Sequence, residues 1–309
     1  MFMKILITGG AGFIGSNLVD RLISEGHSVM ILDDFSSGNE KFVNPKAQVA
    51  RCDVRDAKTV SGVVSEFKPE AVFHLAAQID LRKSIENPQE DYDINVNGSK
   101  NVLDVAVKHG VKKFIFASSA AVYGDNQNLP IKEIEATNAQ TQYGKSKAEI
   151  ESELKEYSQL YGIKSVVLRF ANVYGPRQGT IGEGGVIAIF CKLLNQNKPL
   201  KIFGTGEQTR DFVFVEDIVA ANIRALSSKK DFAIYNVSTS RETSVNTIAN
   251  QLLKISGKSC KIEHQSPVKG EVLRNSLDNH LISEELAWKP NIDLQEGLNR
   301  TWDFFNTSL

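Results

Sequence analysis

Two groups of residues in this 309-residue chain have types and spacings that could perform chemistry. The first is the run Tyr143-Gly144-Lys145-Ser146-Lys147, in which Tyr143 and Lys147 lie one helical turn apart on the same face. A tyrosine with a pKa of about 10 cannot act as a base at neutral pH. A lysine ammonium held beside it favours the phenolate, which could then accept a proton from a substrate hydroxyl. The alternative is an ordinary helix with an exposed tyrosine and two solvated lysines.

The second group is the glycine-rich run TGGAGFIG at residues 8–15. It follows the apolar segment 5–7 and precedes a helical pattern over about 13–25, which is the strand–turn–helix context of a dinucleotide-binding loop. The glycines would allow a tight turn, close approach of a pyrophosphate and close packing of the helix, whose N-terminal N–H groups would face the phosphates. The spacing differs by one residue from G-x-G-x-x-G, and a glycine turn without a ligand is the alternative. The residues concerned are Gly9, Gly12, Phe13, Ile14 and Gly15.

Acidic residues follow the next two strand-like runs. The apolar run 28–32 ends in Asp33 and Asp34. A carboxylate in this place accepts the hydroxyls of the adenosine ribose and repels a 2′-phosphate, which favours NAD over NADP. Further on, residues 52–54 (CDV) close a third strand, where Asp53 could meet the adenine amino group. A helix-capping role for this acid is the alternative.

Two serines lie between the glycine run and the Tyr–Lys pair. Residues 114–124 (FIFASSAAVYG) form an apolar strand that ends in Ser118 and Ser119. Open α/β sheets bind ligands at the carboxyl ends of their strands. Ser119 could therefore hydrogen-bond the reacting hydroxyl and pass its proton to Tyr143. Ordinary capping of the strand end is the alternative.

Composition excludes several classes of partner. The formal net charge of −1 gives no long-range attraction to nucleic acid or to an anionic membrane, so any anionic ligand must be bound by local arginines. The three cysteines, Cys52, Cys191 and Cys260, lie far apart without C-x-x-C spacing, which predicts neither a metal site nor a disulfide framework. No apolar run approaches the ~20 residues of a membrane span. We expect a soluble, cytoplasmic protein.

The order of elements predicts an α/β fold: a Rossmann-like doubly wound parallel sheet with a smaller C-terminal α/β region that binds the substrate. Asn87, Pro88 and Glu90 predict the start of a helix that ends at His109-Gly110. A further helix is expected from Tyr143 to about Tyr161. The strand-like runs lie near residues 3–8, 28–33, 47–51, 71–75, 112–118 and 164–170.

The chain resembles the extended short-chain dehydrogenase/reductase family over essentially its whole length, in particular the nucleotide-sugar epimerases and dehydratases. Among these it is most similar to the compact UDP-hexose 4-epimerases. The resemblance implies an NAD that stays bound while C4 of the sugar is oxidised, the 4-keto sugar rotates and hydride returns to the other face. The segments that carry the resemblance are TGGAGFIGS, ILDDFSSG, CDVRD, HLAAQ, Asn95 within DINVNG, SSAAVYGD, YGKSK, LRFANVYGPR, GEQTRDFVFVED and GEVLRNSLD.

The resemblance also assigns roles to residues. Besides the glycine loop and residues 13–15, the NAD site would include Asp33, Asp34, Ser36, Gly38, Asp53, Val54, Leu75, Ala76, Ala77, Gln78, Asn95, Tyr143, Lys147 and Phe170. Catalysis would rest on Ser119, Tyr143 and Lys147, with Lys147 also binding the nicotinamide ribose. The UDP-sugar would be bound by Ser118, Ser119, Tyr143, Asn172, Val186, Lys201, Phe203, Arg210, Arg274 and Asn275.

Within the substrate set, Asn172 would donate to the diphosphate and Phe203 would cover the uracil. Arg210 and Arg274 would pair with the phosphates, for which fixed guanidinium forks are suited; surface salt bridges are the alternative. The family often has an arginine where this chain has Val268, which weakens the assignment of Arg274.

The resemblance implies domain boundaries as well. Residues 1–170 would form the NAD-binding domain, rejoined by about 211–238, and residues 171–210 and 239–309 would bind the nucleotide sugar. Relatives form homodimers through the helix near residues 90–109 and the helix that starts at Tyr143. The apolar positions compatible with such an interface, which could equally face the sheet, are Val102, Val105, Leu154 and Leu160.

Sequence differences bear on the reaction. Dehydratases of the family carry a carboxylate where this chain has Ala120 and Ala121, so dehydration is not expected. The runner-up activity is decarboxylation or reduction of a nucleotide sugar, and the same positions argue against decarboxylation, which would need a carboxylate there. A non-catalytic NAD-binding regulator would usually lose the tyrosine and the lysine, and this chain keeps both.

One position bears on sugar choice. Five residues after Gly270, the family's gate beside the sugar C2 substituent falls on Asn275, with Ser276 beside it. Neither side chain fills the space of a tyrosine, so an N-acetyl group would fit. We therefore expect interconversion of UDP-GlcNAc and UDP-GalNAc at a rate comparable to or better than that of UDP-Glc and UDP-Gal. The alternative is a loop residue that points away from the sugar.

Overall fold

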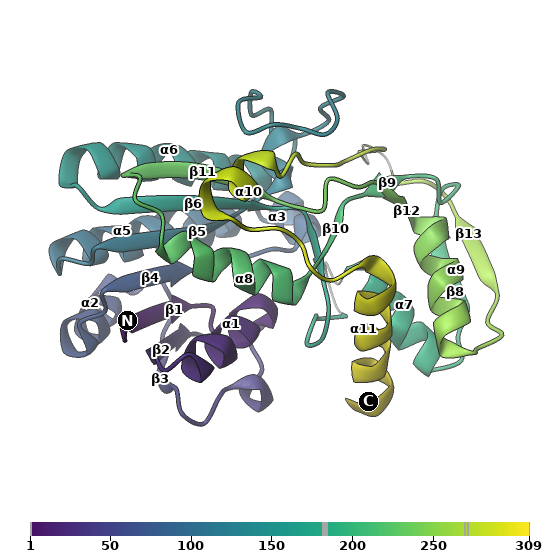
Figure 1. Cartoon of the computed structure of the whole chain (residues 1–309), viewed down its shortest axis with the longest axis horizontal. Coiled ribbons are helices and arrows are strands. Elements are labelled where there is room, and N and C mark those ends of the chain that lie inside the picture. Colours follow the sequence, from purple (N-terminus) through teal and green to yellow (C-terminus); the bar gives the residue numbers. More distant parts are fainter. Residues whose placement is uncertain (1, 181–184, 269, 271, 309) are drawn as a thin grey trace.

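A seven-stranded parallel sheet forms the centre of the protein, with strand order β11-β6-β5-β4-β1-β2-β3 (Figure 1). The computed structural model describes residues 2–180, 185–268, 270 and 272–308. The strands pair in parallel throughout, which confirms the predicted α/β fold. They are β1 (Lys4–Thr8), β2 (Ser28–Asp33), β3 (Gln48–Arg51), β4 (Ala71–His74), β5 (Lys113–Ser119), β6 (Lys164–Phe170) and β11 (Phe232–Val237).

Helices cover both faces of this sheet, which is why its central strands are nearly continuous apolar runs. One face, towards the viewer in Figure 1, carries α1 (Phe13–Ser24), α8 (Val215–Leu226) and α10 (His280–Leu286). The other face carries α2 (Ala57–Phe67), α5 (Ser99–Lys108) and α6 (Gln142–Tyr161). Each face has its own hydrophobic core, one built around Leu18 and Ile218 and the other around Val60, Val102 and Ile150.

The third strand is shorter than predicted. It ends at Arg51, and residues 52–54 lie in the following loop, although the Cys52 amide still donates to the Asp33 carbonyl oxygen. The chain turns at once, because the Asp56 amide donates to the Asp53 carbonyl and Asp56 caps α2.

The helix predicted to start after Asn87 is divided into three parts. Asn87 accepts a hydrogen bond from the Glu90 amide at the start of α4 (Pro88–Tyr92), as expected. A π-helical turn, η2 (Asp93–Gly98), then joins α4 to α5, and the chain leaves the helix at Gly110 with a φ of 73°. The π-helical turn was not predicted, because its widened backbone has no local sequence signal.

The helix predicted from Tyr143 to about Tyr161 follows its prediction closely. Thr141 accepts from the Gly144 amide at the start of α6, and Gly162 provides the left-handed residue after its last turn. Two short elements precede it, α3 (Leu81–Glu86) and the 3₁₀ turn η3 (Ala120–Tyr123), and a further 3₁₀ turn, η1, spans Glu40–Phe42.

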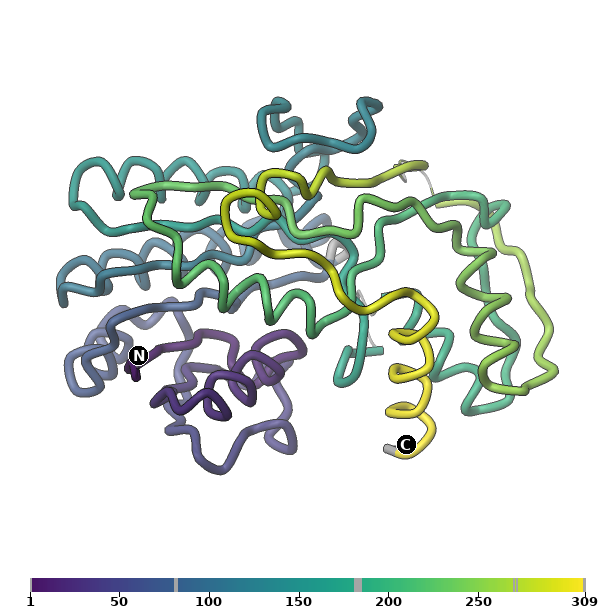
Figure 2. Tube along the Cα trace, viewed as in Figure 1, coloured from purple at the N-terminus to yellow at the C-terminus, as the bar shows by residue number. Residues whose placement is uncertain are grey.

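The C-terminal region lies beyond one edge of the sheet and has its own core, which includes Phe190, Leu252 and Trp302. Figure 2 shows the last part of the chain running from α10 over the sheet to α11 in this region. Its elements are β7 (Asn172–Tyr174), α7 (Val186–Asn195), β8 (Leu200–Phe203), β9 (Thr209–Arg210), β10 (Phe212–Phe214), β12 (Thr243–Ser244), α9 (Val245–Ser256), β13 (Ile262–Gln265) and α11 (Leu294–Ser308).

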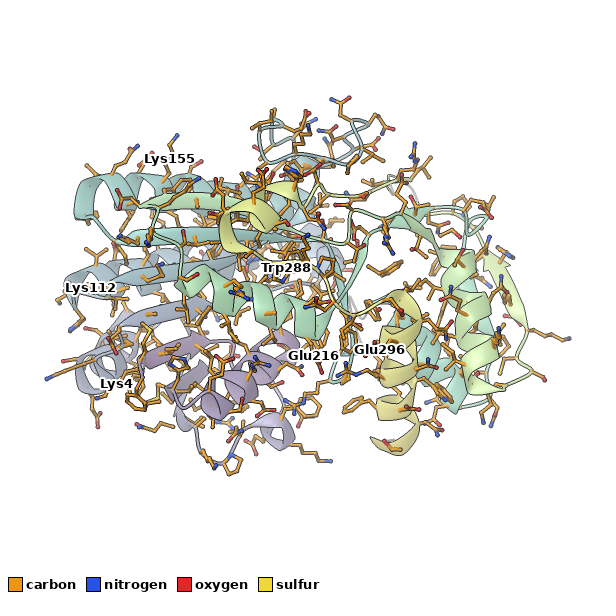
Figure 3. All side chains as sticks on the ribbon, viewed as in Figure 1. Lys4, Lys112, Lys155, Glu216, Trp288 and Glu296 are labelled. Atoms are coloured by element: carbon orange, nitrogen blue, oxygen red, sulfur yellow. The ribbon has the colours of Figure 1, made fainter. Side chains whose placement is uncertain are left out.

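Polar contacts connect the two parts of the chain. Arg300 of α11 forms ion pairs with Glu216 of α8 and with Glu296, both of which are labelled in Figure 3. The Trp288 indole donates to the Asp217 carbonyl oxygen at 2.9 Å. Among the described helices, none is both long enough and apolar enough to cross a membrane.

Candidate active site

The carboxyl ends of the central strands meet at one edge of the sheet, because parallel strands all end on the same side. Residues at these ends include Thr8 of β1, Asp33 of β2, His74 of β4, Ser119 of β5 and Phe170 of β6. The C-terminal region lies at this edge (Figure 1). The predicted site residues therefore come from loops that converge on one place.

The glycine loop has the shape that a dinucleotide requires. Gly12 precedes α1 and supplies no side-chain cap, so the first N–H groups of this helix are available to a phosphate. A Cβ atom on Gly9, whose φ is 70°, would lie 2.7 Å from the Ala76 amide nitrogen, and one on Gly15 would lie 2.1 Å from the Gly9 carbonyl oxygen. Gly9 and Gly15 thus pack against neighbouring backbone, while the first N–H groups of α1 have no side-chain cap. This arrangement fits a bound pyrophosphate.

Asp33 holds this loop in place. Its buried carboxylate accepts hydrogen bonds from the Ala11 amide at 2.9 Å and the Phe35 amide at 2.8 Å. Burial raises its pKa above the ordinary value, and the backbone donors oppose that rise. Gly38 packs against it, since a Cβ there would lie 2.8 Å from the Asp33 Oδ1. Each carboxylate oxygen has a second lone pair, so contact with a ribose stays a prediction that this geometry allows.

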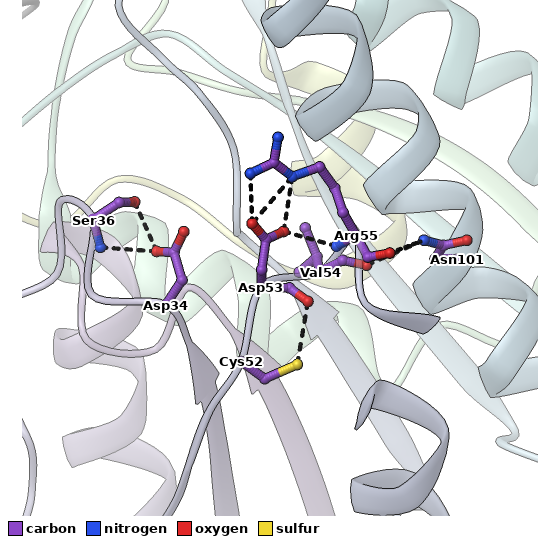
Figure 4. A network of polar contacts seen from close by, with 7 residues as sticks. All are labelled: Asp34, Ser36, Cys52, Asp53, Val54, Arg55 and Asn101. Carbon is purple, nitrogen blue, oxygen red and sulfur yellow. Dashed lines mark hydrogen bonds and ion pairs between the residues drawn. The ribbon is translucent and has the colours of Figure 1, made fainter. Parts of the chain in front are cut away.

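The neighbouring acids have partners of their own (Figure 4). Asp34 accepts from the Ser36 amide at 2.8 Å and from the Ser36 hydroxyl at 2.7 Å. Asp53 forms a two-pronged ion pair with Arg55, and this hydrogen bonding lowers the pKa of Asp53. Asp56 caps α2 by accepting from the Thr59 amide, so the capping alternative considered for Asp53 is wrong. Contact between Asp53 and the adenine amino group stays a prediction.

The loop after β4 is fixed by the π-helical turn. The Gln78 amide donates to Asn95 Oδ1 at 2.8 Å, and Asn95 Nδ2 donates to the Gln78 carbonyl oxygen at 2.8 Å. Two residues predicted to contact NAD, far apart in the chain, are therefore directly bonded. The other predicted residues of this loop are half-buried: Leu75, Ala76 and Ala77.

A buried histidine supports the same loop. His74 lies between the Thr8 hydroxyl, 2.7 Å from Nδ1, and the Ser99 hydroxyl, 2.8 Å from Nε2. Burial lowers the pKa of His74 to about 3, so the ring is neutral. The Ser99 hydroxyl donates to the Asn95 carbonyl oxygen, which orients the whole chain of bonds. Sequence reasoning did not single out this role, because it depends on residues from three different elements.

The structure brings Tyr143 and Lys147 together. The Lys147 side chain is buried, donates to the Ala117 carbonyl oxygen at 2.8 Å and lies 4.7 Å from the centre of the Phe116 ring. Its nitrogen is 5.7 Å from the centre of the half-buried Tyr143 ring. Burial lowers the pKa of Lys147 to about 8, and the charges of Asp91 and Glu151 oppose that fall. An ammonium in this place favours a phenolate on Tyr143.

The two serines at the end of β5 have different surroundings. Ser119 is half-buried, and its oxygen accepts from the Ala121 amide at 3.2 Å at the start of η3, so its hydroxyl hydrogen remains able to donate elsewhere. Ser118 is 3% exposed and donates to Glu151 Oε1 at 2.5 Å. Glu151 is itself paired with buried Arg169. This engagement inside the protein argues against direct substrate contact by Ser118.

Most predicted substrate residues lie on separate elements of the C-terminal region. Asn172 is exposed at the start of β7, and Val186 is half-buried at the start of α7. Lys201 and Phe203 belong to β8, and Phe203 is 43% exposed.

Two predicted cofactor residues are mostly enclosed by protein: Val54 and Phe170.

Glu242 connects the two segments that carry the arginines. Arg274 is exposed and forms a two-pronged pair with Glu242, at 2.9 Å from Nε and 2.5 Å from Nη2. Glu242 also accepts from the Thr209 hydroxyl, next to Arg210. Phosphate binding by either arginine stays a prediction, and for Arg274 it requires exchange of this carboxylate partner. Glu271, part of the same family segment, lies outside the described residues.

The residue predicted as the sugar gate is enclosed. Asn275 is 8% exposed, and within the described part of the chain its Oδ1 has no hydrogen-bond partner. The adjacent Ser276 hydroxyl donates to the buried Asp211 carboxylate at 3.3 Å. A buried amide oxygen without a partner is costly, so this atom fits a site where a ligand supplies the donor.

Known proteins that are similar to this chain include UDP-sugar epimerases. A family model described as the NAD dependent epimerase/dehydratase family matches residues 5–238. A putative UDP-glucose 4-epimerase of Methanocaldococcus jannaschii is 45% identical over 297 residues, covering 96% of each chain. A crystal structure of a Thermotoga maritima UDP-glucose 4-epimerase with UDP-glucose is 40% identical, with a TM-score of 0.97 over 99% of each chain. A UDP-N-acetylglucosamine 4-epimerase of Methanobrevibacter ruminantium is 31% identical, with a TM-score of 0.93 over 99% of each chain.

Proposed function

Because the chain belongs to the NAD-dependent epimerase/dehydratase family, we infer that it is an NAD-dependent UDP-hexose 4-epimerase. The observation that carries the mechanism is the buried Lys147 ammonium beside the Tyr143 ring, at the edge of the sheet next to the glycine loop. The residues around this edge fit NAD, as the uncapped helix N-terminus and the packed glycines indicate.

Bound NAD supplies the acceptor and donor for the hydride of the sugar C4. Tyr143, as the phenolate, removes the proton of the C4 hydroxyl and later returns it. Lys147 keeps Tyr143 ionised, and the low dielectric around its buried ammonium strengthens that effect. Ser119 donates a hydrogen bond to the same oxygen and holds the hydroxyl at the tyrosine.

The surroundings of C4 favour epimerisation over related reactions. Elimination or decarboxylation needs an acid or base near the sugar carbons beyond C4. After Ser119 the chain continues as Ala120 and Ala121 in η3, which have no group that could transfer a proton. The 4-keto sugar therefore meets no competing catalyst from this turn, and rotation in the site followed by reduction completes the cycle.

The direct test is conversion of UDP-glucose to UDP-galactose by the purified protein, scored by inversion at C4. The nicotinamide absorbance and fluorescence should report transient reduction when a UDP-sugar is added. Protein that binds NAD and yet inverts C4 of no UDP-hexose would overturn the inference.

We further propose that the site accepts 2-acetamido sugars. The observation that supports this proposal is Asn275, which is small, enclosed and has an amide oxygen free to accept the acetamido N–H. A tyrosine there would collide with an acetyl group, whereas a plain hydroxyl would be unaffected. The protein should therefore interconvert UDP-GlcNAc and UDP-GalNAc at a rate at least comparable to that of the plain hexoses.

Asn275→Tyr tests this gate. It should suppress N-acetyl activity about tenfold or more relative to hexose activity. Leu273→Tyr, on an exposed position of the same segment, is the matched control and should leave the ratio unchanged. If Asn275→Tyr leaves the ratio of N-acetyl to hexose activity unchanged, Asn275 does not control access of the acetamido group.

We also propose a homodimer that works in the cytoplasm. The free thiols of Cys52, Cys191 and Cys260 suit a reducing compartment. For the dimer, three of the four suggested apolar positions are buried inside the protomer, and Leu160 is 73% exposed. The solution mass at micromolar concentration tests the proposal, and a monomeric mass would refute it.

A further inference from the structure

Asp91 occupies an unusual place for a carboxylate. It lies in α4 with no exposed surface and accepts three hydrogen bonds from three other parts of the chain. The Ser146 hydroxyl of α6 donates to Oδ1 at 2.8 Å. Asn95 Nδ2 of the π-helical turn donates to Oδ2 at 3.0 Å, and Gln78 Nε2 of the loop after β4 donates to the same oxygen at 3.3 Å. Burial of a carboxylate at such a junction is costly, so its presence needs a reason.

The three partners belong to the two halves of the site. Ser146 immediately precedes Lys147 in the catalytic helix. Asn95 and Gln78, which bond to one another, are the pair predicted to contact NAD. One carboxylate therefore sets the position of the catalytic helix relative to the cofactor loop. A shift at this junction of a fraction of an ångström would move Tyr143 relative to the nicotinamide ring.

The charge of Asp91 is also directed at the catalytic lysine. Burial raises the pKa of Asp91, while the Ser146 hydroxyl and the charge of Lys147 hold it down. In return, its negative charge favours the ammonium form of Lys147. The three hydrogen bonds come from neutral groups, so the carboxylate charge remains available to the lysine.

The other ionisable groups around Lys147 contribute less negative charge than Asp91. Glu151, one turn further along α6, is bound by the Arg169 guanidinium at 2.5 Å, which compensates most of its charge. His74 is neutral, because burial lowers its pKa to about 3. Tyr143 is the group that the lysine serves. Asp91 differs from Glu151 because its hydrogen-bond donors are all neutral. Its negative charge is therefore not compensated by a guanidinium and stabilises the Lys147 ammonium.

We propose that Asp91 is a positioning residue for the epimerisation: it joins α6 to the loop after β4 and keeps Lys147 in its charged form. This role rests on the proposed function, since it concerns the proton transfer of the same site. It requires no new chemical step, because the Asp91 carboxylate is fully buried and is bonded to Ser146, Asn95 and Gln78.

The pH profile of kcat distinguishes this role from simple structural support. Loss of the Lys147 proton ends stabilisation of the phenolate, so activity falls on the alkaline side of the profile. Asp91→Asn removes the charge at constant size, and the alkaline limb should move to lower pH by about one unit. Asp217→Asn is the matched control: this buried carboxylate accepts from the Asn291 and Ile292 amides and belongs to α8, on the opposite face of the sheet from α6. It should lower stability and leave the limb in place.

Two further variants keep the test decisive. Ser146→Ala removes one hydrogen bond and keeps the charge, so its alkaline limb should stay at the wild-type pH. Asp91→Ser leaves room for a water and gives a neutral variant if Asp91→Asn does not fold. Cofactor affinity is a second readout. NAD should bind about fivefold or more weakly in the neutral Asp91 variants, because weaker hydrogen bonds from Gln78 and Asn95 hold the loop after β4 less firmly.

Outcomes separate the two proposals. A wild-type protein without C4 epimerase activity would overturn the proposed function, and NAD affinity would then still test the junction. An active wild type whose neutral Asp91 variants keep both the wild-type alkaline limb and the wild-type NAD affinity would overturn the role of Asp91. An equal shift of the limb in Asp217→Asn would do the same.

Discussion

Replacement of Gly15 by alanine should distort the glycine loop, and the structure allows the effect to be judged in advance. Gly15 lies in the first turn of α1. A Cβ there would lie 2.1 Å from the Gly9 carbonyl oxygen and 2.8 Å from the Gly10 Cα. Both are backbone atoms of the loop, so no side-chain rotation relieves the contact. Ordinary contact distances of about 3.5 Å require that helix and loop separate by roughly 1.4 Å.

The expected magnitude combines two opposing effects. Glycine to alanine inside a helix stabilises by about 1 kcal/mol through backbone entropy. Overpacking costs about 1–3 kcal/mol and here should reach the upper part of that range, because all of the contacts are with backbone. The net loss of about 1–2 kcal/mol should lower Tm by several degrees in a chain of this size. The shifted N–H groups should also weaken NAD binding about tenfold or more, or about 1.4 kcal/mol.

Gly62→Ala is the matched control. Gly62 lies in α2, is exposed, and a Cβ there would meet nothing within 4 Å. The same substitution should therefore raise stability by up to about 1 kcal/mol and leave NAD binding unchanged.

Thermal unfolding with and without added NAD, together with an NAD titration, measures both effects. The reasoning fails if Gly15→Ala binds NAD as tightly as the wild type and gains stability like Gly62→Ala. A loss of stability without a loss of NAD affinity would limit the role of Gly15 to packing.

Two other predictions concern catalysis and cofactor choice. Tyr143→Phe should lose at least about 3 kcal/mol of transition-state stabilisation, more than a hundredfold in kcat, while UDP binding stays nearly intact; wild-type turnover by this variant would refute the mechanism. The cofactor-free protein should bind NAD about a hundredfold more tightly than NADP, because the carboxylates of Asp33 and Asp34 oppose the 2′-phosphate. Competition between the two dinucleotides measures the ratio, and equal affinities would contradict the assignment.

Local sequence signals were sufficient for much of the fold. The apolar runs placed six strands of the sheet to within a residue or so, apart from the end of β3 at Arg51. The cap at Asn87 follows from the chemistry of the residues that form it, and α6 begins one residue before the predicted Tyr143. These features depend on neighbours within a few positions, so the sequence contains their causes directly.

Spacing also predicted which residues could do chemistry. Tyr143 and Lys147 lie four positions apart, and helical geometry alone places them on one face. The glycine loop follows a strand and precedes a helix in the order that a dinucleotide needs. Resemblance to a family then extended these local signals to a reaction, which the comparisons support.

The tertiary structure decided which polar groups meet across the chain. Asp91 and Ser146 are 55 positions apart, and Thr8 and His74 are 66 apart, so no local pattern indicates either contact. Adjacent serines at the end of β5 received different surroundings, because neighbouring strand residues point to opposite faces and only the packed helices distinguish those faces. The sequence by itself therefore determined most elements up to residue 170 and the placing of Tyr143 and Lys147 on one helix face. The electrostatic surroundings of that pair arise only when distant segments pack together and remove water, since burial sets the strength of every charge in the site.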